Sequence, residues 1–222
     1  MNIRKILCLV LAALMVLSLV SCGKTFTSST SGDGKTASDT KADTAEAGSA
    51  DISGEHVKVA ITVKDFGTMT LELYPDVAPI TVQNFLTYVD EGFYNGLTFH
   101  RIYKGFMIQG GDPAGNGTGN GTHGTIKGEF AQNGVKNDIS HKRGVISMAR
   151  SNAPDSASCQ FFICDADSTF LDGQYAAFGM LVDGEDVLDA IASTEVKVNP
   201  MTGEQSTPVT PPVIESIVRV AD

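Results

Sequence analysis

Apolar and polar residues alternate with period two in two neighbouring segments near residue 60. The first is 57–63 (VKVAITV), the second is 68–73 (TMTLEL), and Asp65, Phe66 and Gly67 lie between them. Strict alternation gives a strand one apolar face, and a short connection that contains glycine joins antiparallel neighbours. The pattern therefore predicts a β-hairpin.

The period then changes to that of a helix. Pro79 occupies a position that a first helical turn accepts, and apolar residues at 82, 85, 86 and 89 share one face until Gly92. A second helix is predicted over 185–193, where Val187, Leu188 and Ile191 form the apolar face. We expect the first helix to cover one end of the sheet.

Six more short apolar runs are separated by turns rich in Gly, Asn and Asp. They cover residues 97–102, 106–109, 145–149, 160–164, 176–182 and 213–220. Many short strands joined by such turns are typical of a sandwich or a barrel. The fold class predicted from these patterns is therefore mainly β, with two helices.

The N-terminal segment has the pattern of an export signal over residues 1–21. Arg4 and Lys5 precede an unbroken apolar run from Ile6 to Val20. This run is too short for a comfortable membrane span and has the charged flank of a signal peptide.

Cys22 follows the apolar run directly. The sequence LVSC at 19–22 resembles the bacterial lipobox, whose cysteine receives a diacylglycerol. It predicts a lipid anchor on Cys22 that holds the protein on the extracytoplasmic face of the cell membrane. An ordinary secretory signal with an incidental cysteine is the alternative.

Residues 22–55 have the composition of a tether. Beyond Cys22 they are mostly Ser, Thr, Gly, Ala, Asp and Lys, with Phe26 and Ile52 as the only large apolar residues. Such a segment cannot bury a core, and its root-mean-square span is roughly 30 Å. One globular domain is predicted over 56–222.

Composition limits the classes of partner and site. The chain has 222 residues, a net charge of −10 and no Trp, and this acidic balance argues against a nucleic-acid partner. The glycine-rich segment 110–121 lacks the Gly-Lys-Ser/Thr ending of a phosphate-binding loop, and no G-x-S-x-G hydrolase motif is present. The four histidines are scattered without metal-ligand spacing, so no metal site is predicted.

Cys159 and Cys164 lie five positions apart, which is an odd separation. In a strand their side chains would point to opposite faces, so a mutual disulfide is not expected. Both are predicted to be small buried hydrophobic residues.

Four sequence motifs resemble those of a known family. They are FHRIYKGFMIQGGD at 99–112, SMAR at 147–150, SCQFFI at 158–163 and FLDGQYAAFG at 170–179. In this order and at this spacing they resemble the cyclophilin family, and the resemblance extends from about residue 57 to 220. It implies a closed eight-stranded antiparallel barrel capped by two helices. It also implies peptidyl-prolyl cis-trans isomerisation of proline-containing polypeptides, with no cofactor and no covalent intermediate.

The resemblance also implies a role for individual residues. Arg101 matches the catalytic arginine of the family. Adjacent side chains in an extended strand point to opposite faces, so we expect burial for His100 and the groove for Arg101. Gln109 and the Ala149 backbone would hold the peptide, and Gln160 would support Arg101 or the substrate. The proline pocket would be formed by Phe106, Met107, Phe162 and Leu171.

Three positions in the expected peptide site depart from the pattern of many family members. Phe170 stands where they carry Trp, Tyr175 where they carry His, and Arg150 where they carry Asn. Phe170 lacks the indole N–H that donates to cyclosporin in the family, so we expect weak binding of that drug. Tyr175 keeps a ring, and Arg150 changes the neighbouring subsite.

The sequence thus predicts an exported, lipid-anchored prolyl isomerase that acts on proteins folding outside the cytoplasmic membrane. Two other classes remain open at this point. One is a non-catalytic module that retains proline-bearing segments in the same groove. The other is an anchored solute-binding protein, although such proteins usually close two lobes on a ligand.

Overall fold

The computed structural model describes residues 55–220. The predicted signal segment, Cys22 and the tether up to residue 54 lie outside the described residues. Within the described part, no helix is long and apolar enough to cross a membrane.

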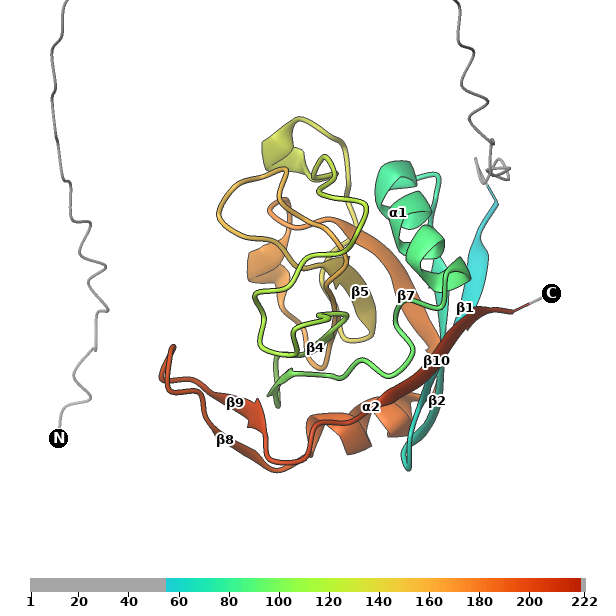
Figure 1. Ribbon diagram of the computed structural model, residues 1–222. Helices are drawn as coiled ribbons and strands as arrows, with labels where there is room; N and C mark the ends of the chain where they lie inside the picture. The colour runs from blue at the N-terminus through green and yellow to red at the C-terminus, as the bar shows by residue number, and fades with distance from the viewer. Residues whose placement is uncertain (1–54, 221–222) are drawn as a thin grey trace, which may run out of the picture. The chain divides into compact units, whose positions relative to one another are not determined.

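One antiparallel sheet of eight strands forms most of the structure (Figure 1). Its strands follow the order β10-β1-β2-β7-β5-β6-β4-β3. They are β1 (Val57–Val63), β2 (Gly67–Leu73), β3 (Arg101–Tyr103), β4 (Met107–Gly110), β5 (Val145–Met148), β6 (Phe161–Cys164), β7 (Ala177–Asp183) and β10 (Ile214–Arg219). Every predicted apolar run overlaps one of these strands, and β1 and β2 form the predicted hairpin, with Val57 opposite Leu73.

The predicted closure of the barrel is not confirmed. The sheet curls, yet within the described residues no ladder joins its edge strands β3 and β10. The segments before them are linked by the bridge between Thr98 and Val213 and by short backbone hydrogen bonds, among them Phe99 N–H to the Pro212 carbonyl (3.0 Å). Pro211 and Pro212 precede this bridge. Since proline has no N–H to donate, the ladder cannot continue through them.

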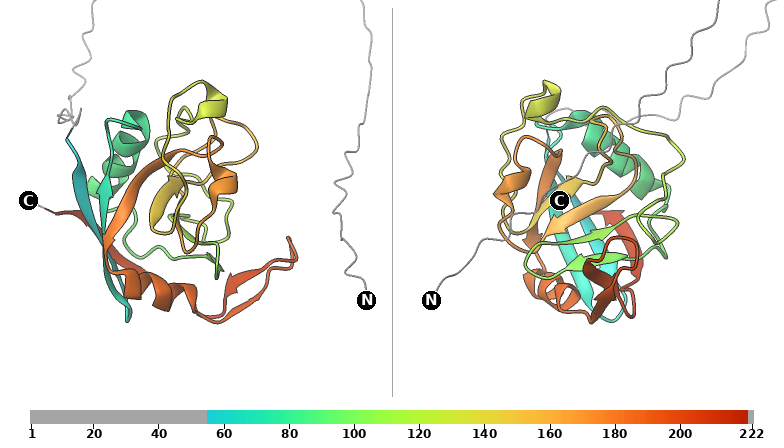
Figure 2. Two further views of the ribbon diagram at one scale, coloured as in Figure 1. Left: turned by 180° about the vertical axis from the view of Figure 1, so that it is seen from behind. Right: turned by 90° about the vertical axis from the view of Figure 1, so that its left-hand side faces the viewer.

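Both predicted helices are confirmed, and they lie at different ends of the sheet (Figures 1 and 2). Helix α1 spans Pro79–Asp90 and α2 spans Glu185–Ala192. Helix α1 has no side-chain cap of its own, but the buried carboxylate of Glu129 accepts hydrogen bonds from the N–H groups of Ile80 (3.1 Å) and Thr81 (2.7 Å). These bonds satisfy two of the backbone donors that a helix N-terminus leaves free.

Two separate apolar clusters form, one on each face of β6. Phe161 and Ile163 belong to the main core, whereas Phe162 and Cys164 belong to a smaller cluster with Met107 and Leu171. This division follows from the period of two along a strand. The smaller cluster is the part of the interior that the resemblance assigned to the proline pocket.

The expectation for the two cysteines is confirmed. Cys159 lies in the main core and Cys164 in the smaller cluster, and both are fully buried free thiols. Burial raises the pKa of Cys159 to about 11 and that of Cys164 to about 12. Neither thiol is therefore a nucleophile at neutral pH.

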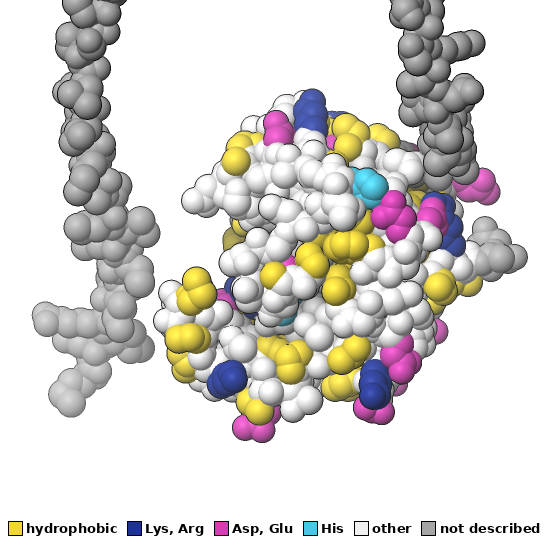
Figure 3. Space-filling view, viewed as in Figure 1, with side chains coloured by type: hydrophobic (Ala, Val, Ile, Leu, Met, Phe, Trp, Pro, Cys, Tyr) yellow, Lys and Arg dark blue, Asp and Glu magenta, His cyan; other side chains and the backbone are white. Residues whose placement is uncertain are grey.

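A second, two-stranded sheet was not predicted. Strands β8 (Val196–Val198) and β9 (Gln205–Pro208) form a hairpin that extends away from α2, and β9 packs beside β3. Figure 3 shows hydrophobic side chains on its surface. Met201, in the turn between the two strands, is 82% exposed. Short 3-10 turns also form at Ala131–Asn133 (η1) and Thr169–Leu171 (η2).

Candidate active site

A cavity of about 150 Å³ opens over the smaller apolar cluster. Its lining includes every predicted catalytic or peptide-binding residue except Gln160 and Phe170. The lining residues are Arg101, Phe106, Met107, Gln109, Ala149, Arg150, Phe162, Leu171 and Tyr175.

Strand register brings these distant positions together. Arg101 lies opposite Gln109 across β3 and β4, and Gln109 lies opposite Phe162 across β4 and β6. Ser147 in β5 lies opposite Phe162 on its other side. Because partners in a ladder point to the same face, a cation, an amide and an aromatic ring line up across three strands.

The Arg101 guanidinium is held from two directions. Its Nη1 donates to Gln109 Oε1 (3.2 Å) and approaches Met107 Sδ (3.5 Å). Its Nε and Nη2 donate to the two carboxylate oxygens of Glu204, each at 2.7 Å. The adjacent His100 is 8% exposed, so the predicted division between a buried histidine and a groove-facing arginine is confirmed.

Glu204 is the polar residue of the site that sequence reasoning missed. It belongs to the turn between β8 and β9 and lies 103 positions from Arg101. No motif or periodicity connects the two residues. Hydrogen bonds from Arg101 hold the pKa of the Glu204 carboxyl below its usual value, so the carboxylate is ionised at neutral pH.

Gln160 is connected to Arg101 by hydrogen bonds through an intermediate residue, Gln109. Gln160 Oε1 accepts from Gln109 Nε2 (3.0 Å), and Gln160 Nε2 donates to the Gly119 carbonyl (2.8 Å). A chain of side-chain hydrogen bonds thus runs from the glycine-rich loop through Gln160 and Gln109 to Arg101. Gln160 lines a neighbouring polar cavity of about 390 Å³ instead of the apolar one.

The glycine-rich segment forms a loop with several tight turns, and the carboxylate of Asp112 holds these turns in place. Asp112 accepts hydrogen bonds from the backbone N–H groups of Ala114 (2.8 Å), Asn116 (2.9 Å) and Gly117. Gly117 has φ +89°, a conformation that glycine adopts without strain. The loop therefore presents its backbone to Gln160 in a fixed position.

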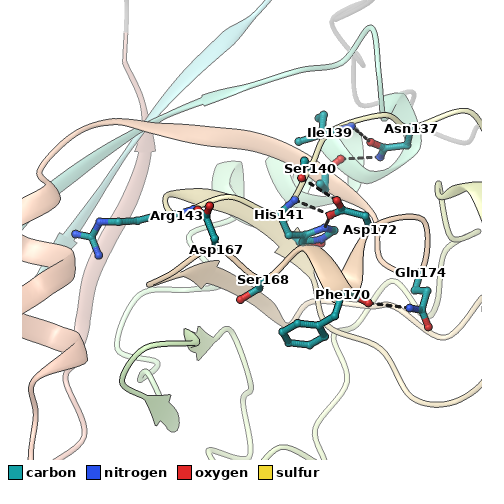
Figure 4. Close-up of polar contacts among 12 residues, drawn as sticks. Asn137, Ile139, Ser140, His141, Arg143, Asp167, Ser168, Phe170, Asp172 and Gln174 are labelled. Carbon is teal, nitrogen blue, oxygen red and sulfur yellow. Dashed lines mark hydrogen bonds and ion pairs between the residues drawn. The ribbon is translucent and has the colours of Figure 1, made fainter.

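A hydrogen-bonded network surrounds the buried side chain of His141, and Figure 4 shows its contacts with Asp172. His141 Nδ1 contacts Asp172 Oδ1 (2.9 Å), and His141 Nε2 contacts Ser147 Oγ (3.1 Å). The three residue types are those of a hydrolase triad, but Ser147 is fully buried and cannot reach a substrate. The His141 ring instead stacks on Phe162, with centroids 6.1 Å apart.

This network fixes the wall of the cavity. Asp172 directly follows Leu171, and it also accepts from Ser140 Oγ and the His141 backbone N–H, each at 2.7 Å. Burial lowers the pKa of His141, although Asp172 opposes that effect. The imidazole is consequently neutral at pH 7 and serves as a packing surface for Phe162.

The three positions that depart from the family pattern take different places. Phe170 is 65% exposed on the rim, with its ring 5.5 Å from that of Phe106. Tyr175 packs edge-on against Phe162 inside the cavity. The Arg150 guanidinium stacks on the Tyr175 ring at 4.6 Å and donates to the Gln174 carbonyl, and it lines both the apolar and the polar cavity.

Over the described residues, no group of three or more His, Cys, Asp or Glu side chains could hold a metal ion. The chemical resources of the site are therefore a fixed guanidinium, two amide side chains and an apolar cavity. An arrangement of this kind can bind a small apolar ring and offer hydrogen-bond donors beside it.

Known proteins resemble this chain over the same region. The family described as "Cyclophilin type peptidyl-prolyl cis-trans isomerase/CLD" matches residues 58–219. Peptidyl-prolyl cis-trans isomerase A of Dickeya dadantii is 44% identical over 156 residues, which is 68% of this chain and 78% of that protein. Peptidyl-prolyl cis-trans isomerase B of Escherichia coli is 42% identical over 159 residues, which is 68% of this chain and 93% of that protein.

Solved structures show the same fold. The crystal structure of a Cryptosporidium parvum cyclophilin type peptidyl-prolyl cis-trans isomerase has a TM-score of 0.67 at 29% identity, over 76% of this chain and 99% of that one. The same protein in the presence of the dipeptide Ala-Pro has a TM-score of 0.66 at 30% identity, over 74% of this chain and 99% of that one.

Proposed function

Because the chain belongs to the cyclophilin-type peptidyl-prolyl cis-trans isomerase family and is an isomerase of that kind, we propose that it accelerates X–Pro isomerisation in exported or envelope polypeptides. The observation that carries this proposal is the position of Arg101, which lines the apolar cavity formed over Phe162 and Leu171. The solved relative with Ala-Pro supports a proline-containing ligand.

The proposed chemistry is electrostatic. Rotation about an X–Pro bond breaks amide resonance and faces a barrier of about 18–20 kcal/mol. In the twisted state the prolyl nitrogen regains its lone pair and becomes a hydrogen-bond acceptor. A fixed donor on Arg101 then stabilises the transition state more than the ground state, which is what catalysis requires.

The share of the activation free energy that Arg101 removes can be estimated from typical magnitudes. An acceleration of about 10⁵-fold corresponds to about 7 kcal/mol. One charge-assisted donor in a dry site contributes about 3–4 kcal/mol of this. The apolar cavity would supply the remainder by holding the proline ring in a twisted, partly desolvated geometry.

The peptide backbone would be held on both sides of the proline. Gln109 offers its side-chain amide from β4. The Ala149 N–H already donates to the Gln160 carbonyl (3.0 Å), so Ala149 would hold the peptide through its own carbonyl. Arg150 would act on the residues that extend into the polar cavity.

The test of the proposed function is the exchange rate of a short Xaa-Pro peptide, followed by NMR exchange spectroscopy. We expect exchange that accelerates in proportion to catalytic amounts of the protein. Saturable binding without faster exchange would overturn the proposal and favour the non-catalytic module. Family membership leaves no support for the solute-binding alternative.

We propose further that Cys22 carries a lipid anchor on the extracytoplasmic face, which the lipobox at 19–22 supports. Replacement of Cys22 by alanine should move the protein from the membrane into soluble fractions without abolishing export, because the tether has no other membrane-binding feature. Detergent partition measures this. Cys8→Ala is the matched control, since Cys8 lies inside the signal and its loss should leave the protein anchored. Membrane retention of the Cys22→Ala protein would contradict the anchor.

The drug-binding proposal concerns the rim of the cavity. We propose weak binding of cyclosporin, because the exposed Phe170 has no N–H to donate where many relatives carry Trp.

A further inference from the structure

The ion pair between Arg101 and Glu204 joins the main sheet to the β8–β9 hairpin. It is bidentate, with both N–O distances at 2.7 Å, and the two side chains are 32% and 26% exposed. A bidentate pair fixes the plane of a guanidinium as well as its position.

The turn that carries Glu204 is built to hold it. The Asn199 N–H donates to the Glu204 carbonyl (2.7 Å), and the Gly203 N–H donates to the Asn199 carbonyl (2.8 Å). Gly203 has φ +73°, the left-handed conformation that this tight turn requires. The Glu204 backbone is thus fixed next to β3 by hydrogen bonds within the hairpin.

The ion pair uses some N–H donors of the Arg101 guanidinium and leaves another directed at the cavity. A guanidinium has five N–H groups. Glu204 accepts from Nε and Nη2, on the side away from the cavity, while Nη1 faces Gln109 and the thioether of Met107. A thioether is a weak acceptor, so a substrate atom can readily replace it. The donor that remains exchangeable is therefore the one on the cavity side.

We propose that Glu204 is a positioning residue that orients the Arg101 guanidinium so that Nη1 addresses the peptide, an inference that rests on the proposed role of Arg101. It acts through Arg101 and does not touch the substrate. Gln109 restrains the guanidinium at one nitrogen only, so without Glu204 the group can rotate about its long side chain.

The first test is a split between turnover and binding. Glu204→Gln should lower kcat about tenfold and leave KM nearly unchanged, because a small misplacement of a catalytic group affects the transition state most. Glu204→Asp, which keeps the carboxylate, should recover part of the loss. Glu195→Gln is the matched control, since Glu195 is an exposed carboxylate at the start of the same hairpin. It should leave both constants unchanged.

An NMR measurement distinguishes a loss of guanidinium orientation from a general disturbance of the folded structure. In the wild-type protein the Arg101 Nε–H should give a sharp, slowly exchanging NMR resonance, assigned by its absence in Arg101→Lys. We expect Glu204→Gln to broaden or remove this resonance while the backbone spectrum and the thermal unfolding midpoint stay close to the wild type. An unchanged resonance would overturn the inference.

The outcomes distinguish this inference from the proposal beneath it. Loss of activity in Arg101→Ala with normal kcat in Glu204→Gln would overturn the role of Glu204 and leave the role of Arg101 intact. A faster Glu204→Gln enzyme would also overturn it, because Glu204 would then compete with the peptide for the guanidinium. Normal activity in Arg101→Ala would remove the premise itself.

Discussion

Replacement of Arg101 by alanine is expected to slow X–Pro isomerisation by about 10²- to 10³-fold. The peptide Kd should change much less, because the key hydrogen bond strengthens only in the twisted state. Arg101→Lys keeps the charge but loses the planar fork that Glu204 and Gln109 hold, so it should also lose most of the activity. NMR exchange rates at saturating peptide, together with peptide titrations, measure the two quantities.

The matched control for Arg101 is Lys104→Ala. Lys104 lies just beyond β3 and contacts Ser193 Oγ (3.0 Å), so this change removes one positive charge near the site without altering the cavity lining. It should leave exchange rates unchanged. An Arg101→Ala protein with near-normal rates would contradict the electrostatic mechanism.

The pH profile provides a second check on the same mechanism. Arginine does not titrate near neutrality, and the pKa of Glu204 is held below its usual value by Arg101. Burial also lowers the pKa values of His100 and His141 below the usual histidine value, which moves their titration away from the neutral range. Turnover should be nearly flat between about pH 6 and 8, and a bell-shaped profile centred near the histidine pKa would contradict it.

The strands and helices were predictable because their signals are local. The alternation over 57–63 and 68–73 sets the hairpin of β1 and β2, and the helical face at 82, 85, 86 and 89 sets α1. The same period of two separates Phe161 from Phe162. It explains why Phe161 and Ile163 of β6 belong to the main core, whereas Phe162 and Cys164 belong to the smaller cluster.

Other features depend on contacts between distant residues, and local patterns do not report them. Glu204 meets Arg101 only because the β8–β9 hairpin folds back beside β3. Whether the sheet closes into a barrel depends on how far strand pairing continues beyond the bridge between Thr98 and Val213. Pro211 and Pro212 limit that pairing. The roles of the apolar lining residues were suggested by resemblance, because an apolar residue in a cavity wall and one in a core have the same local pattern.

Phe170→Trp should tighten cyclosporin binding by about 10- to 100-fold. The drug's acceptor finds no donor on Phe170, and an unsatisfied buried acceptor costs about 1–3 kcal/mol. The structure places this side chain where a longer ring system can be accommodated. It is 65% exposed, it stands on the rim beside Phe106, and it does not line the cavity itself. The change should therefore leave the proline pocket and the exchange rate nearly intact.

Tyr103→Trp is the control for this effect. Tyr103 is 43% exposed and its ring lies 6.1 Å from that of Phe106, so the variant introduces the same indole beside the same aromatic neighbour at a different position. Isothermal titration of the drug into the wild type and both variants measures the difference. Because the resemblance places the N–H that pairs with the drug at the position of residue 170, Tyr103→Trp should bind like the wild type. Equal affinities for the wild type and Phe170→Trp would show that Phe170 does not border the drug subsite.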